Sequence, residues 1–376
     1  MEGNDKGKIS DAGRKATGMK PSIVILGVGR SGTTALYSAL QNVLYGCFDG
    51  LVKSIYEPFL WEWTVFNKRL NAITDEFTYM SSVSYQGIAK HHQLPMLISE
   101  EMVAQYKTDE FLCELFKLDS GCQALIAKLI RANGRYHLLR SILPDAIWIT
   151  MMRNPLDVVN SSAAMFSFYG EDFHASDYER FCLEVEQWYG PASLNLPRVT
   201  VIQKHAFYWY FMSRVLLEES IGDNRVFPLL YEQYRLDQTE FINDIVNKLG
   251  IKMTSMLMTA PQKKVGPSYS SVNLTKDEIL GLQVYMELYQ ELLNTYFPDT
   301  ANIVNCEKIM DRYLKNYRKQ KSIDRFYGRT PLYIKNNLSP RSLTVSSRCG
   351  ILNCFRYIPS KLWQIKKFLK NVKSLV

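Results

Sequence analysis

The chain has 376 residues, 47% of them hydrophobic and 12% aromatic, which excludes a wholly disordered protein and allows one large α/β domain or two domains. Its seven cysteines are scattered and include no C-x-x-C pair, so the sequence suggests neither a disulfide framework nor a cysteine zinc site. The formal net charge of +8 is uneven, because residues 305–376 hold 17 Lys and Arg against three acidic residues, a balance of +14.

The first residues of the chain, 1–20, are polar and lack the apolar segment of a signal peptide. No run of about 18 apolar residues occurs anywhere in the sequence, so no membrane-spanning helix is predicted. The polar composition of residues 1–20 predicts a disordered lead. Scattered cysteines fit a reducing compartment, so we expect a cytoplasmic protein.

A glycine-rich turn follows the first apolar run. Ile23–Leu26 predicts a short strand, glycines stand at 27, 29 and 32, and apolar helical spacing begins at Thr33. Glycine allows positive φ and close approach of a ligand, and the N–H groups of a helix's first turn attract anions. The turn is therefore expected to bind phosphate.

The residue types in this turn point to a particular phosphate ligand. The spacing from Gly27 to Gly32 is that of an NTPase loop, but Thr33 stands where such loops carry the lysine that reaches the β- and γ-phosphates. Arg30 is the cation here instead. Arg-Ser-Gly-Thr-Thr resembles the 5'-phosphosulfate loop of sulfotransferases, which use 3'-phosphoadenosine 5'-phosphosulfate (PAPS) and no metal. The resemblance implies that five residues bind this co-substrate: Arg30, Ser31, Gly32, Thr33 and Thr34. It also implies that Arg30 takes part in catalysis.

A second strand is predicted over Leu51–Tyr56, and Glu57-Pro58 ends it. A parallel sheet would bring Glu57 beside the phosphosulfate loop, and Tyr-Glu-Pro resembles a segment of carbohydrate sulfotransferases. We therefore expect Glu57 to be the general base, with a helix cap or an ion pair as the alternative role. Residues 60–120 are expected to form helices of a substrate-side insertion.

The third predicted strand, Ala124–Ile130, is apolar except for Lys128. A lysine inside an apolar run is costly unless it is paired or lies at an edge, which favours a functional role. Lys128 and Arg131 resemble the Lys-x-x-Arg of the third strand of the sulfotransferase family. The resemblance implies that Lys128 stabilises the bridging oxygen during transfer.

Residues 146–162 carry the second motif. A strand over Ala146–Thr150 leads to Arg153, and a helix follows with Pro155 near its first turn. Ser161 lies about two turns into that helix. An arginine fork and a hydroxyl facing one crevice form a good receptor for a phosphate dianion. Arg-Asn-Pro-x-Asp-x-x-x-Ser resembles the 3'-phosphate motif of the same family, so one bisphosphorylated nucleotide is expected to bridge both motifs.

Later segments complete an alternating pattern: a helix over 206–218, a strand over 225–231, and a helix over 241–249 ended by Gly250. This alternation predicts an α/β fold with a central parallel sheet flanked by helices, in which ligands bind at the carboxyl ends of the strands.

Two further residues are candidates for nucleotide binding. Tyr231 lies in a segment similar to the Tyr-Glu strand of the family, whose tyrosine packs near the adenine, and a core tyrosine is the alternative. Lys264 belongs to a basic loop with Gly and Pro that can close over the phosphates, and a solvated loop is the alternative.

The carboxyl-terminal part differs in composition from the rest. We expect three regions: the lead over 1–20, a sulfotransferase α/β domain over 21–300, and a basic extension over 301–376. The last residues, 361–376, have an apolar stripe at helical spacing among lysines, which predicts a basic amphipathic helix. It can lie on an anionic membrane surface or pack on its own domain or a partner.

The motifs together predict a sulfotransferase that moves a sulfuryl group from PAPS to a hydroxyl or amine of an acceptor, without a metal. The Tyr-Glu-Pro segment and the basic tail favour a carbohydrate or glycolipid acceptor, and no nucleic-acid partner is expected. Three alternatives stay open at this point: a small-molecule sulfotransferase, a P-loop kinase, and a catalytically inactive nucleotide-binding or membrane-associated protein.

Overall fold

The computed structural model describes residues 20–56, 95–106, 110–118, 120–130, 132–163, 175–251, 272–301 and 304–317, which all belong to one compact unit. Several predictions lie outside these residues. They concern Glu57, Arg131 and Lys264, nearly all of the lead 1–20, much of the insertion 60–120, and the amphipathic helix 361–376.

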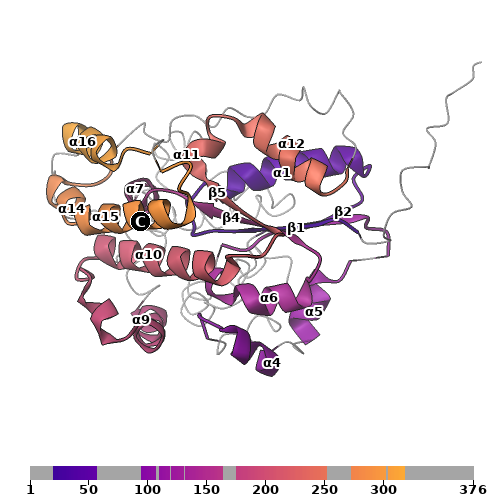
Figure 1. Ribbon diagram of the computed structural model, residues 1–376, viewed down its shortest axis with the longest axis horizontal. Helices are drawn as coiled ribbons and strands as arrows, with labels where there is room; N and C mark the ends of the chain where they lie inside the picture. Colours follow the sequence, from indigo (N-terminus) through magenta and orange to yellow (C-terminus); the bar gives the residue numbers. More distant parts are fainter. Residues whose placement is uncertain are drawn as a thin grey trace, which may run out of the picture. The chain divides into compact units, whose positions relative to one another are not determined.

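The described residues form one five-stranded sheet in the order β2-β3-β1-β4-β5, and every neighbouring pair is parallel (Figure 1). The strands are β1 Ser22–Leu26, β2 Val52–Tyr56, β3 Ala124–Lys128, β4 Ile147–Met152 and β5 Val226–Leu230. Every residue of β3 and β4 is buried, as expected for parallel strands covered on both faces. The predicted α/β class with a central parallel sheet is confirmed.

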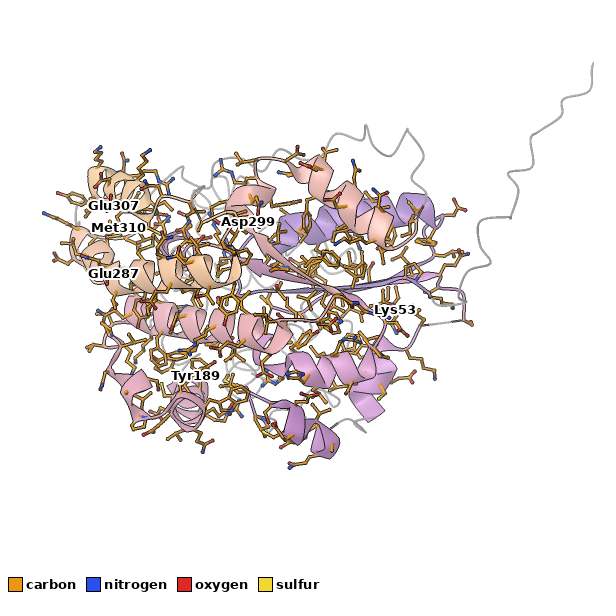
Figure 2. All side chains as sticks on the ribbon, in the orientation of Figure 1. Lys53, Tyr189, Glu287, Asp299, Glu307 and Met310 are labelled. Carbon is orange, nitrogen blue, oxygen red and sulfur yellow. The ribbon has the colours of Figure 1, made fainter. Side chains whose placement is uncertain are left out.

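Helices cover both faces of this sheet. Helices α1 (Thr33–Cys47) and α12 (Gln238–Lys248) lie on one face, and α5 (Glu110–Phe116), α6 (Tyr136–Ile142) and α10 (Val201–Ser220) lie on the other (Figure 1). Alternate residues of β1 enter the two cores, because successive side chains of a strand point to opposite faces. Figure 2 shows side chains filling the space between the ribbons on both sides of the sheet.

The remaining helices continue the chain around these layers. They are η3 Glu100–Met102, α4 Val103–Tyr106, η4 Asn133–Arg135, α7 Pro155–Ala163, α9 Ala175–Tyr189, η6 Pro191–Asn195, α11 Tyr231–Tyr234, α14 Lys276–Leu280, α15 Gln283–Tyr296 and α16 Cys306–Asn316. Among the helices in the described part of the chain, none is both long and apolar enough to cross a membrane.

Element boundaries differ slightly from the predicted ones for identifiable reasons. Helix α10 begins five residues early because Thr200 and Gln203 form a reciprocal capping box that starts the helix at Val201. Helix α12 has Asp237 as its cap, and Gly250 follows its end with the left-handed φ of 67° typical of a helix stop.

The strand order fixes the position of the site. Strand β1 has β3 on one side and β4 on the other, so the chain reverses its direction across the sheet beside β1. Ligands bind to such sheets outside the carboxyl ends of the strands at this switch point. The glycine-rich loop after β1 and Arg153 after β4 both lie there.

Candidate active site

The glycine-rich loop starts at a position that only glycine can occupy. Gly27 has a φ of 146°, and a Cβ atom there would lie 2.5 Å from the carbonyl oxygen of Met151. Its N–H donates to the Oδ1 atom of Asn133 at 2.8 Å. The 3₁₀ turn after β3 therefore holds the start of the loop, a contact that no sequence motif indicated.

The same 3₁₀ turn also anchors the segment that begins at Pro95. The N–H of Ile98 donates to the carbonyl of Gly134 at 2.8 Å, and the Nε of Arg135 donates to the carbonyl of Pro95 at 2.8 Å. The N–H of Leu97 donates to the carboxylate of Glu184 at 2.7 Å. Residues 95–98 are thus tied to the element that supports Gly27.

The end of the loop has the geometry of an anion site. Arg30 has a left-handed φ of 73° and an exposed side chain, and Gly32 is the N-cap of α1 with a φ of 96° and no side-chain cap. The uncapped first turn of a helix offers N–H groups and a positive dipole end to an anion. The hydroxyl of Ser31 is buried and has no hydrogen-bond partner within the described ranges, so it fits a further donor to a bound phosphate.

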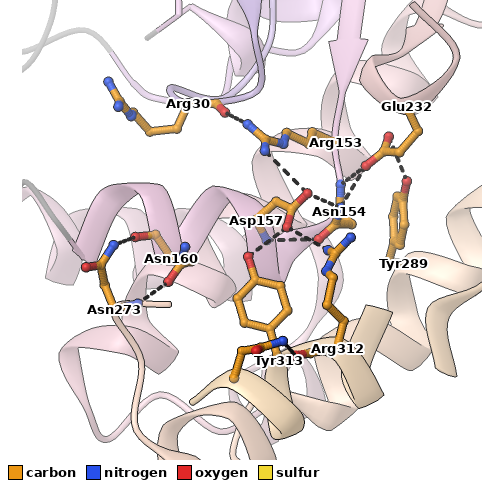
Figure 3. Close-up of polar contacts among 11 residues, drawn as sticks. Arg30, Arg153, Asn154, Asp157, Asn160, Glu232, Asn273, Tyr289, Arg312 and Tyr313 are labelled. Atoms are coloured by element: carbon orange, nitrogen blue, oxygen red, sulfur yellow. Dashed lines mark hydrogen bonds and ion pairs between the residues drawn. The ribbon is translucent and has the colours of Figure 1, made fainter. Parts of the chain in front are cut away.

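The two sequence motifs meet at this loop. The Nε atom of Arg30 donates to the hydroxyl of Ser161 at 2.9 Å. The Nη1 atom of Arg153 donates to the carbonyl of Arg30 at 3.0 Å (Figure 3). The guanidinium of Arg153 lies over the ring of Tyr231, with 4.3 Å from Cζ to the ring centroid. A Cβ atom at Gly32 would overlap that same ring. The structure thus gathers Arg30, Arg153, Ser161 and Tyr231 around one point.

Lys128 approaches the loop from the opposite side, because β3 and β4 flank β1 on opposite sides. Its side chain is buried, with 1% of the residue exposed, and Nζ donates to the Thr34 hydroxyl at 2.6 Å. The Tyr56 hydroxyl lies 3.5 Å from Nζ, and the ammonium lies 4.4 Å from the centroid of the Tyr56 ring. Two hydroxyls and an aromatic face therefore hold one buried cation next to the first turn of α1.

A polar network contacts Arg153 through Asp157, and no sequence motif indicated most of its members. Asn154 donates its amide and its backbone N–H to the carboxylate of Glu232, at 2.8 and 3.1 Å. The Tyr289 hydroxyl donates to the other oxygen of Glu232 at 3.3 Å. Burial raises the pKa of Glu232, and the hydrogen bonds from Asn154 oppose that effect. Asp157 forms the second half of the network, with Arg153 on one side and Tyr313 on the other (Figure 3).

The residues described do not cover every predicted participant. Glu57 and Lys264 lie outside them, although Glu57 directly follows Tyr56 in the sequence. No group of three or more His, Cys, Asp or Glu side chains that could hold a metal ion occurs among the residues with described structure. The roles assigned to the site residues, and a reaction without metal, stay predictions.

Comparisons with known proteins agree with the resemblance found in the motifs. A family model described as "Sulfotransferase family" matches residues 21–255. No curated protein matches the chain.

Similar solved structures are also sulfotransferases. The enzyme from Alicyclobacillus acidocaldarius is 15% identical with a TM-score of 0.39, and the match covers 73% of this chain and 96% of that chain. Sulfotransferase STF9 from Mycobacterium avium is 15% identical with a TM-score of 0.41, covering 76% and 79%. Mouse sulfotransferase SULT7A1, complexed with PAP, is 13% identical with a TM-score of 0.36, covering 79% and 90%.

Proposed function

Because the chain belongs to the sulfotransferase family, we propose that it binds PAPS at the loop after β1 and transfers the sulfuryl group to an acceptor hydroxyl or amine. One observation carries this proposal. Arg30 of the first motif contacts Ser161 of the second at 2.9 Å, and Arg153 contacts the backbone of Arg30 at 3.0 Å. The two motifs, whose arginines are 123 residues apart in the chain, are thus in contact, which supports one shared anion site.

The nucleotide is proposed to lie across this site with its two phosphate groups on different partners. The loop amides, Ser31 and the first turn of α1 bind the 5'-phosphosulfate, and Arg153 with Ser161 binds the 3'-phosphate. Tyr231 lines the same site, which its contact with the Arg153 guanidinium supports. Lys264 is proposed as a further phosphate contact on sequence alone.

The proposed reaction is an in-line transfer. The acceptor oxygen or nitrogen attacks sulfur, the bond from sulfur to the bridging oxygen of the 5'-phosphate breaks, and 3',5'-ADP leaves. Negative charge grows on the bridging and sulfuryl oxygens, and cations near those atoms stabilise the transition state. Arg30 and Lys128 supply these charges from the two sides of the loop.

Glu57 is the proposed general base that accepts the acceptor's proton. Its neighbour Tyr56 supports this role, because the Tyr56 hydroxyl lies 3.4 Å from the hydroxyl of Thr34 in the loop. Glu57 directly follows Tyr56 in the sequence, which supports a position near the loop.

The acceptor and the location are proposed from sequence features. Tyr-Glu-Pro at 56–58 favours a carbohydrate or glycolipid over a small molecule. The basic extension over 301–376, which follows the proposed domain 21–300, would bring a cytoplasmic protein to an anionic membrane through its last helix.

Calorimetry of nucleotide binding tests the nucleotide assignment. We expect tight binding of 3',5'-ADP without magnesium, weaker binding of 5'-AMP, and little binding of ATP with magnesium. Preference for the magnesium complex of ATP would instead support a kinase.

Replacement of Glu57 by Gln tests the base. Glu57→Gln should keep the affinity for 3',5'-ADP and reduce turnover of labelled PAPS by about 10²-fold or more, the usual contribution of a general base. Turnover equal to that of the wild type would remove Glu57 from the mechanism.

A further inference from the structure

The arginine of the proposed 3'-phosphate site is held by a carboxylate that a distant helix orients. We propose that Tyr313, on α16, is a positioning residue: through Asp157 it sets the orientation of Arg153 and so the enzyme's preference for a 3'-phosphorylated nucleotide. The inference rests on the proposed function, because it concerns the same nucleotide site.

Asp157 is the link between the two. Its side chain is 0% exposed, and Oδ2 accepts from Arg153 Nη2 at 3.3 Å and from Asn154 Nδ2 at 2.8 Å. Its other oxygen, Oδ1, accepts from the Tyr313 hydroxyl at 2.7 Å and from Arg312 Nη2 at 3.3 Å. One carboxylate oxygen therefore belongs to the site and the other to α16 (Figure 3).

The two contacts at Oδ1 are not equivalent. Tyr313 is buried and its hydroxyl makes the shorter contact, whereas the side chain of Arg312 is 39% exposed and lies farther away. A buried carboxylate must be hydrogen-bonded on both oxygens, since an unsatisfied one loses its solvation without compensation. Without the Tyr313 hydroxyl, the carboxylate rotates toward Arg312 and Oδ2 leaves Arg153.

Three described contacts set the orientation of the Arg153 guanidinium. Nη1 contacts the Arg30 carbonyl, Nη2 contacts Asp157, and the face of the guanidinium lies on Tyr231. A planar fork binds phosphate well only when its plane is correctly oriented. Loss of the Asp157 contact removes one of these constraints on the plane and therefore weakens binding of a phosphate dianion.

Helix α16 lies beyond residues 21–255, which the family model matches, and within the basic extension expected over 301–376. The family motif includes Asp157, but its second oxygen accepts from two residues of α16, Tyr313 and Arg312. Part of this chain's extension thus reaches the nucleotide site through one buried contact.

A purely structural role for Tyr313 makes a different prediction. Loss of a packing contact lowers the melting temperature and weakens every nucleotide alike, whereas a positioning role changes the ratio of two affinities. The measurement is therefore the ratio of the dissociation constants of 5'-AMP and 3',5'-ADP, by calorimetry, for the full-length protein. The two ligands differ only in the 3'-phosphate.

The variants include a closely matched control. Tyr136 is also a buried tyrosine that donates to a carboxylate, Asp223, at 2.6 Å, and Arg140 contacts the same carboxylate at 2.7 Å. Asp223 lies before the amino end of β5, whereas the site lies at the carboxyl ends of the strands. Tyr136→Phe therefore removes the same kind of contact far from the nucleotide.

We expect Tyr313→Phe to lower the preference for 3',5'-ADP about tenfold, or roughly 1.4 kcal/mol, while the affinity for 5'-AMP stays within about twofold. Tyr136→Phe should lower the melting temperature and leave the ratio unchanged. Arg312→Gln should lower the ratio by no more than about threefold, because Tyr313 still donates to Oδ1. If Tyr313→Phe does not fold, Asp157→Asn tests the same link, since it removes the charged acceptor that joins Tyr313 to Arg153, and it should lower the ratio about tenfold or more.

Arg153→Ala serves as the reference that shows the full contribution of the 3'-phosphate site. If Arg153→Ala abolishes the preference but Tyr313→Phe, or Asp157→Asn in its place, keeps it, the inference is wrong and the proposed function stands. If the wild type does not prefer 3',5'-ADP over 5'-AMP, or if Arg153→Ala keeps that preference, then both the inference about Tyr313 and the proposed 3'-phosphate site are wrong.

Discussion

Replacement of Gly32 by Ala gives a direct test of how the loop is built. Gly32 has a φ of 96°, and a residue with a Cβ pays about 1–2 kcal/mol for a left-handed backbone. The new methyl group would also overlap the ring of Tyr231, far inside the roughly 3.5–4.0 Å of a carbon–carbon contact. Overpacking of a filled site costs about 1–3 kcal/mol.

These two effects together predict a loss of about 2–5 kcal/mol in the free energy of unfolding, which lowers the melting temperature by roughly 3–9 °C. The assay is thermal unfolding of the ligand-free protein. Gly29→Ala is the matched control in the same loop, because its Cβ would meet only the Ile130 side chain, at 3.5 Å, and its φ lies outside the left-handed region.

A double variant separates the two causes. Gly32→Ala combined with Tyr231→Ala should be less destabilised than the sum of the single variants, because the second change removes the overlap. The affinity of Gly32→Ala for 3',5'-ADP should also fall about tenfold or more, since the displaced ring supports the Arg153 guanidinium. Equal melting temperatures for Gly32→Ala and Gly29→Ala would refute the reasoning.

Two further predictions concern charged groups. Lys128→Met should keep the affinity for 3',5'-ADP within a few-fold and reduce kcat about 10²-fold to 10³-fold, as expected for loss of a group that stabilises developing charge. An unchanged rate constant of the chemical step in single-turnover assays would exclude that role. The hydrogen bond to Glu219 raises the pKa of His137 from 6.5, and burial opposes this. The pair therefore contributes full stability below about pH 6.5 and loses it as the pH rises through the higher folded-state pKa. The difference in melting temperature between the wild type and His137→Gln should be larger at about pH 5.5 than at about pH 9, and a difference independent of pH would contradict this.

The parts of the site that were predictable are those encoded locally. The β1 loop and Arg153 were expected at one edge because each follows an apolar strand, and parallel strands end at the same edge. The sequence thus predicts that both motifs lie on the same side of the sheet, but not that the side chains of Arg30 and Ser161 are in contact, at 2.9 Å.

The supporting residues could not be predicted, because their signals are nonlocal. Asn133 precedes a glycine in the sequence, a pattern typical of a surface turn, yet its side chain holds the N–H of Gly27. Tyr313 lies 156 residues from Asp157, and the spacing of α16 indicates only an amphipathic helix. Tyr231 was expected at the end of a strand and instead begins α11, where its ring lies against both Gly32 and Arg153.

The anchors on either side of residues 57–94 have a consequence for how this enzyme can diversify. Tyr56, before that segment, contacts Thr34 and Lys128, and Pro95–Ile98, after it, are tied to the turn that holds Gly27. Both junctions are fixed by contacts that do not depend on the sequence between them. We therefore expect that residues 59–94 can be exchanged while Glu57, Pro58 and the contacts of the donor-nucleotide loop are retained.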